Sequence, residues 1–293
     1  MSAPMDAVEE RSTVSVVPSS LERLGRPADA RLLLIVADAL GASNASNLGV
    51  YRALRDGVAT SAGLQVPCPW ARGAAVDYRG EDVGVSLTVN AEHEAYRWGP
   101  VTQAPSLLDG NGGFPASPAD LWEHADLEET RRECRAQVER AILWGFDVTH
   151  LSAHLGTLSS RPEFFDIYLD LAIEFDLPIS LPDPSVDLGF EARALAAEEG
   201  VLVPDREVPA PLVRAARSAV DAIITDLPAG ITELHVRPAE DTPELRAITP
   251  HWAARVSDAH LVTQDWAFRT ALDRSGAELI TFGELRTAQR RNR

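Results

Sequence analysis

Residues 31–37 read RLLLIVA, in which every side chain after the first is apolar. An uninterrupted apolar run of this length is typical of a strand that is covered on both faces, as in a parallel sheet. Residues 44–56 follow with apolar side chains at helical spacing, and Gly57 ends the helix. The sequence therefore predicts a buried strand followed by a helix.

The same alternation continues to the end of the chain. Further strands are predicted at residues 58–66, 83–89, 148–152, 178–181, 201–203, 231–236 and 277–281. Further helices are predicted at residues 127–143, 162–174, 191–198, 211–225, 242–247 and 265–274. Because strands that alternate with helices make right-handed crossovers, this order predicts an α/β fold, a distorted (β/α) TIM-like barrel with seven to eight parallel strands. An open doubly wound sheet is the alternative.

Composition predicts a disordered leader over residues 1–28 and one barrel domain over residues 29–293. The leader mixes Pro, Ser, Glu and small residues without a sustained period. It lacks the apolar core of a secretory signal, and no stretch approaches the roughly 20 apolar residues of a membrane span. We therefore expect a cytoplasmic protein without a membrane partner. Cys68 and Cys134 have no metal-ligand spacing and are expected to be buried free thiols.

A formal net charge of −17 opposes binding to phosphate backbones, so we expect no nucleic-acid partner. The densest basic cluster, Arg286 to Arg293, lies where a last helix would end. Positive charge there favours the helix dipole.

Polar side chains follow several of the predicted strands. In a parallel barrel the carboxyl ends of the strands form the ligand site. Asp38 comes directly after the first strand, where it is either a general base or a helix N-cap. Near the third strand lie further polar residues, namely Ser86, Thr88, Asn90, Glu92 and His93.

Two pairs of basic residues occur later in the chain. His150 and His154 lie four residues apart. On a helix, two histidines at this spacing can bind the same metal ion. Their segment follows from a predicted strand rather than a helix, so we expect one of the two histidines to have a structural role. His235 and Arg237 alternate along a strand and are predicted to point to the same side. A catalytic metal ion normally has three or more protein ligands. Asp38 and His154 have no obvious third partner, so the sequence gives only weak support for a hydrolytic metal site.

Several blocks of the sequence resemble YdjC-like carbohydrate deacetylases, the family of chito-oligosaccharide deacetylase. They are ADALGASNASNLGVYRALRDGVATSAGLQVPCPW (37–70), GVSLTVNAEHEAYRWGPV (84–101), PSLLDGNGGFP (105–115), THLSAHLGTLSSRPEF (149–164) and ITELHVRPAEDTPELRAI (231–248). The resemblance runs from about residue 32 to 285. It implies a distorted (β/α) barrel, one divalent ion such as Mg²⁺ or Zn²⁺, and hydrolysis of the amide bond of an acetylated amino sugar.

The resemblance assigns the metal site to positions that this chain has changed. Asp38 matches the proposed base, but Ala39 stands where the second Asp of the pair would bind the metal. Ser86 stands in place of the first ligand His, whereas His154 matches the second. A methyl group binds no cation, and a serine hydroxyl is a poor ligand compared with imidazole.

Further changes lie near the same site. Ser152 replaces an Asp that precedes the retained His, and Arg237 replaces a late His before Pro238. A guanidinium is permanently charged. At about 5 Å and an effective dielectric constant of about 20 it would repel a divalent ion by several kcal/mol. His150 matches a family position too, and we expect it to satisfy a core hydrogen bond.

The residues leave open whether the chain is an enzyme. One hypothesis is a metal-free relative that binds a saccharide or an acetylated amino sugar through Ser86, Thr88 and Glu92, with an aromatic and planar group from Tyr96, Arg97 and Trp98. Packing of a long loop is the other explanation of these last three residues.

A second hypothesis is a metal-independent hydrolase with Asp38 as base, His154 as its acid or base partner and Arg237 as an oxyanion clamp. A third hypothesis is an ordinary metal-dependent deacetylase, in which Glu92 or Asp241 supplies the missing ligand of the divalent ion. A fourth makes the chain a regulatory partner of an intact relative, and homodimerisation through surface helices is expected in barrel proteins. The preferred interpretation is a deacetylase-type scaffold for which no cofactor is expected.

Overall fold

The computed structural model describes residues 19–209 and 223–291. The helix predicted at residues 211–225 falls mostly outside these ranges, as do residues 1–18 of the predicted leader.

The described strands form one curled, parallel sheet around β1. They are β1 (Arg31–Leu40), β2 (Ser61–Leu64), β3 (Val83–Leu87), β4 (Val148–Ala153), β5 (Arg206–Val208), β6 (Gly230–Val236) and β7 (Glu278–Leu279). Their order is β4-β3-β2-β1-β6-β5, and β7 pairs with the start of β1 at Leu32 and Leu33. β2 pairs with β1 only from Val36 onward, so the long first strand holds three neighbours.

The sheet is a half-barrel, consistent with a distorted barrel, but two predicted strands are missing from it. Residues 178–181 contribute a single bridge between Ile179 and Leu151, and the N–H of Ile179 donates to the carbonyl of Leu202 at 3.0 Å. The Tyr168 hydroxyl donates to the carbonyl oxygens of Leu151 (2.8 Å) and Ser180 (3.0 Å). Isolated pairings and the Tyr168 hydroxyl therefore continue the sheet where the strands 178–181 and 201–203 were expected. The described part of the chain has seven strands, one of them only two residues long.

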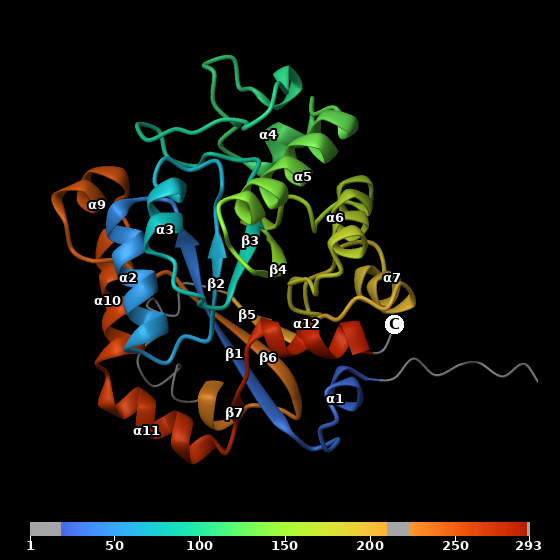
Figure 1. Cartoon of the computed structure of the whole chain (residues 1–293), viewed down its shortest axis with the longest axis vertical. Coiled ribbons are helices and arrows are strands. Elements are labelled where there is room, and N and C mark those ends of the chain that lie inside the picture. The colour runs from blue at the N-terminus through green and yellow to red at the C-terminus, as the bar shows by residue number, and fades with distance from the viewer. Residues whose placement is uncertain (1–18, 210–222, 292–293) are drawn as a thin grey trace, which may run out of the picture.

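Helices surround the sheet. They are α1 (Ser20–Arg23), α2 (Asn44–Arg55), α3 (Ala71–Asp77), α4 (Pro118–Trp122), α5 (Leu127–Leu143), α6 (Pro162–Phe175), α7 (Ala192–Glu198), α9 (Pro243–Ile248), α10 (Trp252–Thr263), α11 (Trp266–Ser275) and α12 (Phe282–Arg291), with single 3-10 turns at Pro105–Leu107 and His154–Gly156. In Figure 1, α2, α3 and α10 lie on one side of the sheet, α5 and α6 on the other, and α12 crosses in front. None of the described helices combines the length and apolarity that a membrane crossing requires.

Most predicted helices are confirmed, including the exact span of α5. The helices α3, α4 and α10 were not predicted from the sequence, whereas α12 is the last helix expected at the basic cluster. The predicted leader also contains α1, which Ser19 caps and whose Leu21 is buried against the sheet. The end of the predicted leader is therefore packed on the barrel.

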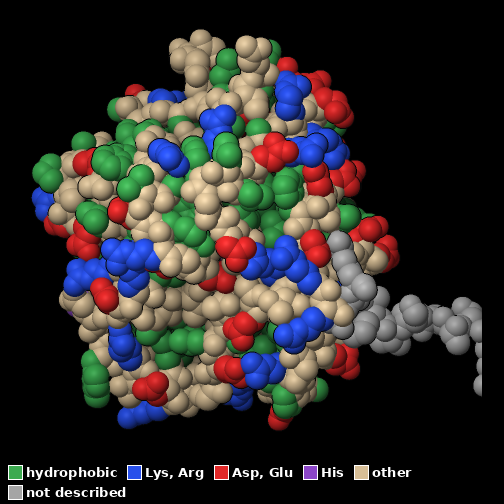
Figure 2. Space-filling view, in the orientation of Figure 1, with side chains coloured by type: hydrophobic (Ala, Val, Ile, Leu, Met, Phe, Trp, Pro, Cys, Tyr) green, Lys and Arg blue, Asp and Glu red, His purple; other side chains and the backbone are tan. Residues whose placement is uncertain are grey.

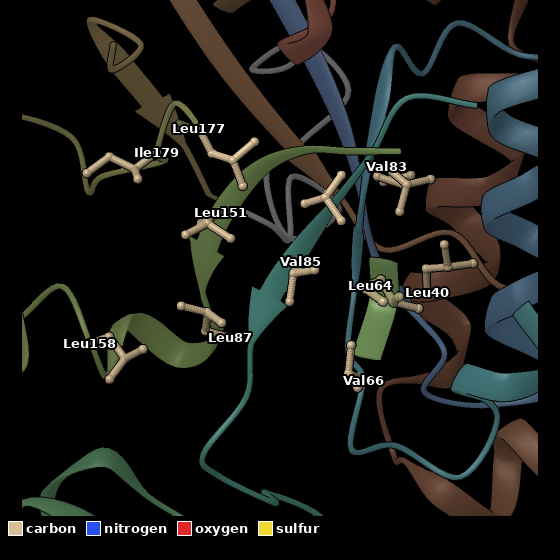
Figure 3. Packing of buried hydrophobic residues seen from close by; sticks show 14 of the residues in the cluster. Leu40, Leu64, Val66, Val83, Val85, Leu87, Leu151, Leu158, Leu177 and Ile179 are labelled. Carbon is tan, nitrogen blue, oxygen red and sulfur yellow. The ribbon is translucent and has the colours of Figure 1, made fainter. Parts of the chain in front are cut away.

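The outer face of the sheet carries the main apolar core. Figure 3 shows Leu64, Val85 and Leu151 from three neighbouring strands packing within it. Cys68 and Cys134 are buried free thiols, as predicted. On the face drawn in Figure 2, arginine and acidic side chains are interspersed rather than separated by sign.

A second apolar cluster fills the inner face of the sheet at the amino ends of the strands. Leu32, Leu34 and Val36 of β1 pack there against Phe282 and Leu285 of α12. The cluster closes one end of the half-barrel, and a cavity lies at the other end, toward the carboxyl ends of the strands.

His150 belongs to this closed end. Its ring stacks on Phe282 with centroids 3.8 Å apart, and a Cβ at Gly84 would lie 2.4 Å from its Nδ1 atom. Burial lowers the pKa of His150 to about 3, which keeps the ring neutral. This placement agrees with the structural role predicted for His150.

We predict that Phe282→Ala lowers the free energy of unfolding by about 3–5 kcal/mol, because it empties the inner cluster and removes the stacking partner of His150. Urea unfolding followed by circular dichroism measures the change. Leu143→Ala is the control, because Leu143 is 84% exposed and should shift stability by no more than about 0.5 kcal/mol. If the two variants had equal free energies of unfolding, this would contradict a stabilising apolar cluster at the closed end of the half-barrel.

Candidate functional site

A cavity of about 190 Å³ opens at the carboxyl ends of β1, β3, β4 and β6. This is the end of a parallel barrel at which ligand sites form. Most of the predicted site residues line it, namely Asp38, Ala39, Ser86, Glu92, Trp98, His154 and Arg237. Ser152, Ser180, Glu207, His235 and Arg255 line it as well.

Thr88 and Tyr96, predicted to bind substrate, do not line the cavity. Thr88 is fully buried, and its backbone N–H and carbonyl bind the Gln137 amide at 2.9 and 2.8 Å. The Tyr96 hydroxyl donates to the carbonyl of Ala42 at 2.9 Å. Both residues therefore bind neighbouring parts of the protein and do not face the cavity.

Arg97 and Trp98 organise the loop after β3. Arg97 forms an ion pair with Asp109 and donates to the carbonyl of Phe114, away from the cavity. The Trp98 indole is 5% exposed, and its N–H donates to the carbonyl of Asn90 at 2.8 Å. Packing of a long loop therefore accounts for Arg97, while Trp98 also presents part of its ring to the cavity.

His235 lies among three carboxylates in the cavity. Its Nδ1 is 3.0 Å from Asp38 Oδ2, and its Nε2 is 3.0 Å from Glu233 Oε1 and 3.8 Å from Glu207 Oε1. The other oxygen of Glu233 accepts a hydrogen bond from the Ser180 hydroxyl at 2.8 Å. Because Glu233 and His235 alternate along β6, both point to the inner face of the sheet.

These charges fix the protonation of the pair. Burial alone would lower the pKa of His235, but the charges of Asp38 and Glu233 outweigh it and raise that pKa well above its usual value. Burial would raise the pKa of Asp38, yet the charge and hydrogen bond of His235, then Arg237, bring it below its usual value. The pair is therefore an imidazolium and a carboxylate at neutral pH.

His154 has both ring nitrogens engaged. Nδ1 lies 2.8 Å from the Gln65 side-chain nitrogen, and Nε2 lies 3.0 Å from Glu92 Oε2. Since the Gln65 oxygen faces the Cys68 thiol, the amide N–H donates to Nδ1, and Nε2 carries the proton shared with Glu92. Burial raises the pKa of Glu92, but the interaction with His154 brings it down to about 2.

Two non-glycine residues with left-handed backbone lie on the cavity wall. Ala39 has φ 69° and Leu155 has φ 54°. Such conformations cost of order 1–3 kcal/mol each and cluster at ligand sites. At Ala39 the register of β1 against β2 shifts, so the end of β1 departs from regular strand geometry beside Asp38.

The side chains at the positions assigned to the metal do not fit a divalent ion. Ala39 offers a methyl group, Ser86 a hydroxyl, and His154 has no free ring nitrogen. In residues 19–209 and 223–291, no group of three or more His, Cys, Asp and Glu side chains is placed to hold a metal.

The proposed rescue ligands do not complete such a site. Glu92 reaches the cavity but binds His154. Asp241 lies outside it in an exposed pair with Arg246, at 2.7 Å.

Sequence reasoning found some cavity residues and missed others. The alternation of His235 and Arg237 was recognised, but not the carboxylates that surround His235. Arg255 comes from α10, which was not predicted, so no pattern pointed to it.

A half-barrel whose closed end is apolar, with a polar cavity at the carboxyl ends of parallel strands, defines a barrel protein of the (β/α) class, and barrels of this class form their ligand sites at that end. A profile of the YdjC-like protein family matches residues 32–274, and the chain belongs to this family.

Named relatives agree with this assignment. A carbohydrate deacetylase of Thermus thermophilus is 37% identical over 247 residues, which cover 81% of this chain and 88% of that protein. A carbohydrate deacetylase of Brevibacillus brevis is 36% identical over 154 residues, 51% of this chain and 59% of the relative. A chitooligosaccharide deacetylase of Yersinia pestis is 29% identical over 160 residues, again 59% of the relative.

The fold has also been seen in a solved structure. An Enterococcus faecalis protein with a suggested role in cellobiose-phosphate cleavage superposes with a TM-score of 0.75 at 21% identity, over 87% of this chain and 99% of that one. At this identity the likeness concerns the fold alone.

We predict that His235 stays protonated at pH 7.5, while His150 is neutral down to pH 5. NMR of labelled histidine side chains measures both, with His235→Gln and His150→Gln for assignment. Asp38→Asn should lower the pKa of His235, because it removes one of the two carboxylates that lie 3.0 Å from the ring. Asp241→Asn, in an exposed pair, should leave it unchanged. A His235 ring that is neutral at pH 7 in the unaltered protein would contradict the arrangement.

Proposed function

We propose that this chain is a carbohydrate deacetylase-type hydrolase that receives an acetylated amino sugar in the cavity and cleaves its amide C–N bond without the family's divalent ion. The family and its carbohydrate deacetylase relatives support the substrate class. The changed donor set at Ala39 and Ser86 supports the loss of the metal. The observation that carries the proposal is the His235 imidazolium beside Asp38, which provides positive charge within the cavity.

The chemistry assigns one task to each group. Asp38 takes a proton from a water molecule, whose oxygen attacks the amide carbon. Arg237 donates to the oxygen of the carbonyl as it becomes negative. The C–N bond then breaks, and the amine leaves with the proton that Asp38 took from the water, while Glu92 holds the neighbouring His154 ring through Nε2. The products are acetate and the free amino sugar.

The low pKa of Asp38 limits this chemistry. A general base is most effective when its pKa lies near the working pH, so Asp38 is a weak base at neutral pH. His235 holds one of its oxygens, at 3.0 Å. We therefore expect slow turnover.

A second candidate is a saccharide-binding protein without turnover. The engagement of both His154 ring nitrogens favours it, because His154 must first leave one partner before it can exchange a proton with a substrate. The two candidates share the cavity and differ only in whether acetate is released.

We predict that protein purified without chelator contains less than about one-tenth of an equivalent of divalent metal by mass spectrometry. It should release acetate slowly from N-acetylglucosamine oligomers, at a rate that EDTA does not change. Asp38→Asn should lower this rate at least about 100-fold, because it removes the base. Asp241→Asn, an exposed carboxylate outside the cavity, is the control and should retain the rate.

The outcomes separate the candidates. Saccharide binding in calorimetry without acetate release would favour the binding protein over the hydrolase. A stoichiometric ion whose removal abolishes turnover would contradict the metal-free site.

A further inference from the structure

Two hydrogen bonds join the segment after β6 to the helix α10. The N–H of Arg237 donates to Asp258 Oδ2 at 2.9 Å, and the N–H of Ala239 donates to the carbonyl of Arg255 at 3.2 Å. Arg255 and Asp258 lie three residues apart on α10, so they share one face of the helix, and both are buried. These contacts fix the places from which Arg237 and Arg255 reach the cavity that both line.

Neither guanidinium has a partner among the described residues. Arg255 is only 9% exposed, yet within residues 19–209 and 223–291 its side chain forms no hydrogen bond or ion pair, and the same holds for the Arg237 side chain. An arginine carries five N–H donors and a permanent charge. No nitrogen of these two side chains is among the described buried polar atoms that lack a partner, so their donors face the open space of the cavity. By contrast, the Arg97 side chain forms an ion pair with Asp109 and donates to the carbonyl of Ala91.

The two charges also oppose each other. Burial lowers the pKa of Arg255, and the charge of Arg237 lowers it further. Glu92 and Asp258 offset part of this repulsion from a distance, but Glu92 binds His154 and Asp258 binds the backbone of Arg237. An anion between the guanidiniums would supply the missing acceptor and remove the repulsion.

We propose that Arg255, together with Arg237, forms a subsite for an acidic group of the ligand, so that the cavity prefers saccharides that carry a carboxylate or a phosphate. This inference rests on the proposed saccharide function and adds the charge of the substrate. The planar fork of a guanidinium matches two oxygen atoms of either group. The subsite lies beside Asp38 and His154, so an acidic substituent bound there would hold the amide near those groups.

Calorimetry with four probes tests the subsite: inorganic phosphate, N-acetylglucosamine, N-acetylmuramic acid for the carboxylate and N-acetylglucosamine 6-phosphate for the phosphate. We expect at least one acidic sugar to bind about tenfold or more tightly than the neutral sugar, since charged hydrogen bonds to arginine are strong. The tighter of the two identifies the acidic group.

Arg255→Gln should reduce this preference for the acidic sugar to about one, and Arg237→Gln should reduce it as well. Arg255→Lys keeps the charge without the fork and should retain part of the preference, which separates anion binding from a loss of folding; circular dichroism checks each variant. Arg246→Gln, whose guanidinium is exposed and paired with Asp241, is the matched control and should keep the full preference.

The failure of this inference is distinct from the failure of the proposed function. Equal affinity for neutral and acidic sugars, or a preference that survives Arg255→Gln, overturns the subsite and leaves the saccharide function standing. Binding of inorganic phosphate that depends on Arg255, without binding of any sugar, supports the subsite and contradicts the saccharide function. Binding of none of the four probes overturns both.

Discussion

The ring of His235 lies between Asp38 on β1 and Glu233 on its own strand, and this contact determines the electrostatics of the cavity. A neutral ring would leave carboxylates facing one another in a buried space, where like charges are costly. A protonated ring balances them. The pairing also joins the end of β1 to β6, the neighbouring strands with the most extensive register in the sheet. The contact therefore balances charge at the place where these two paired strands end.

The barrel permits this arrangement because its other end is closed with apolar side chains. Phe282 of α12 and the first half of β1 fill the inner face, and the neutral ring of His150 packs against them. Charged groups are thereby confined to the carboxyl ends of the strands. Strained backbone at Ala39 and Leu155 lies on the cavity wall, not in the apolar end.

Positive charge in the cavity comes from side chains. His235, Arg237 and Arg255 provide it, opposite Asp38 and Glu92. These cationic side chains are fixed in position by the chain, and they carry no exchangeable water ligand of the kind that a metal ion would carry. This favours binding and orientation of a polar or acidic ligand over strong activation of water, which accords with the slow chemistry expected of Asp38.

The sequence by itself determined the alternation of strands and helices, the apolar first strand and the polar residues at strand ends, because these depend on local periodicity. From the family resemblance, Ala39, Ser86 and Arg237 were also predicted to be changed positions. Only the tertiary structure decided that residues 178–181 and 201–203 make single pairings, since pairing depends on a distant neighbour. It alone placed Arg255 and the carboxylates around His235, because charges meet across a fold through contacts that local spacing does not encode.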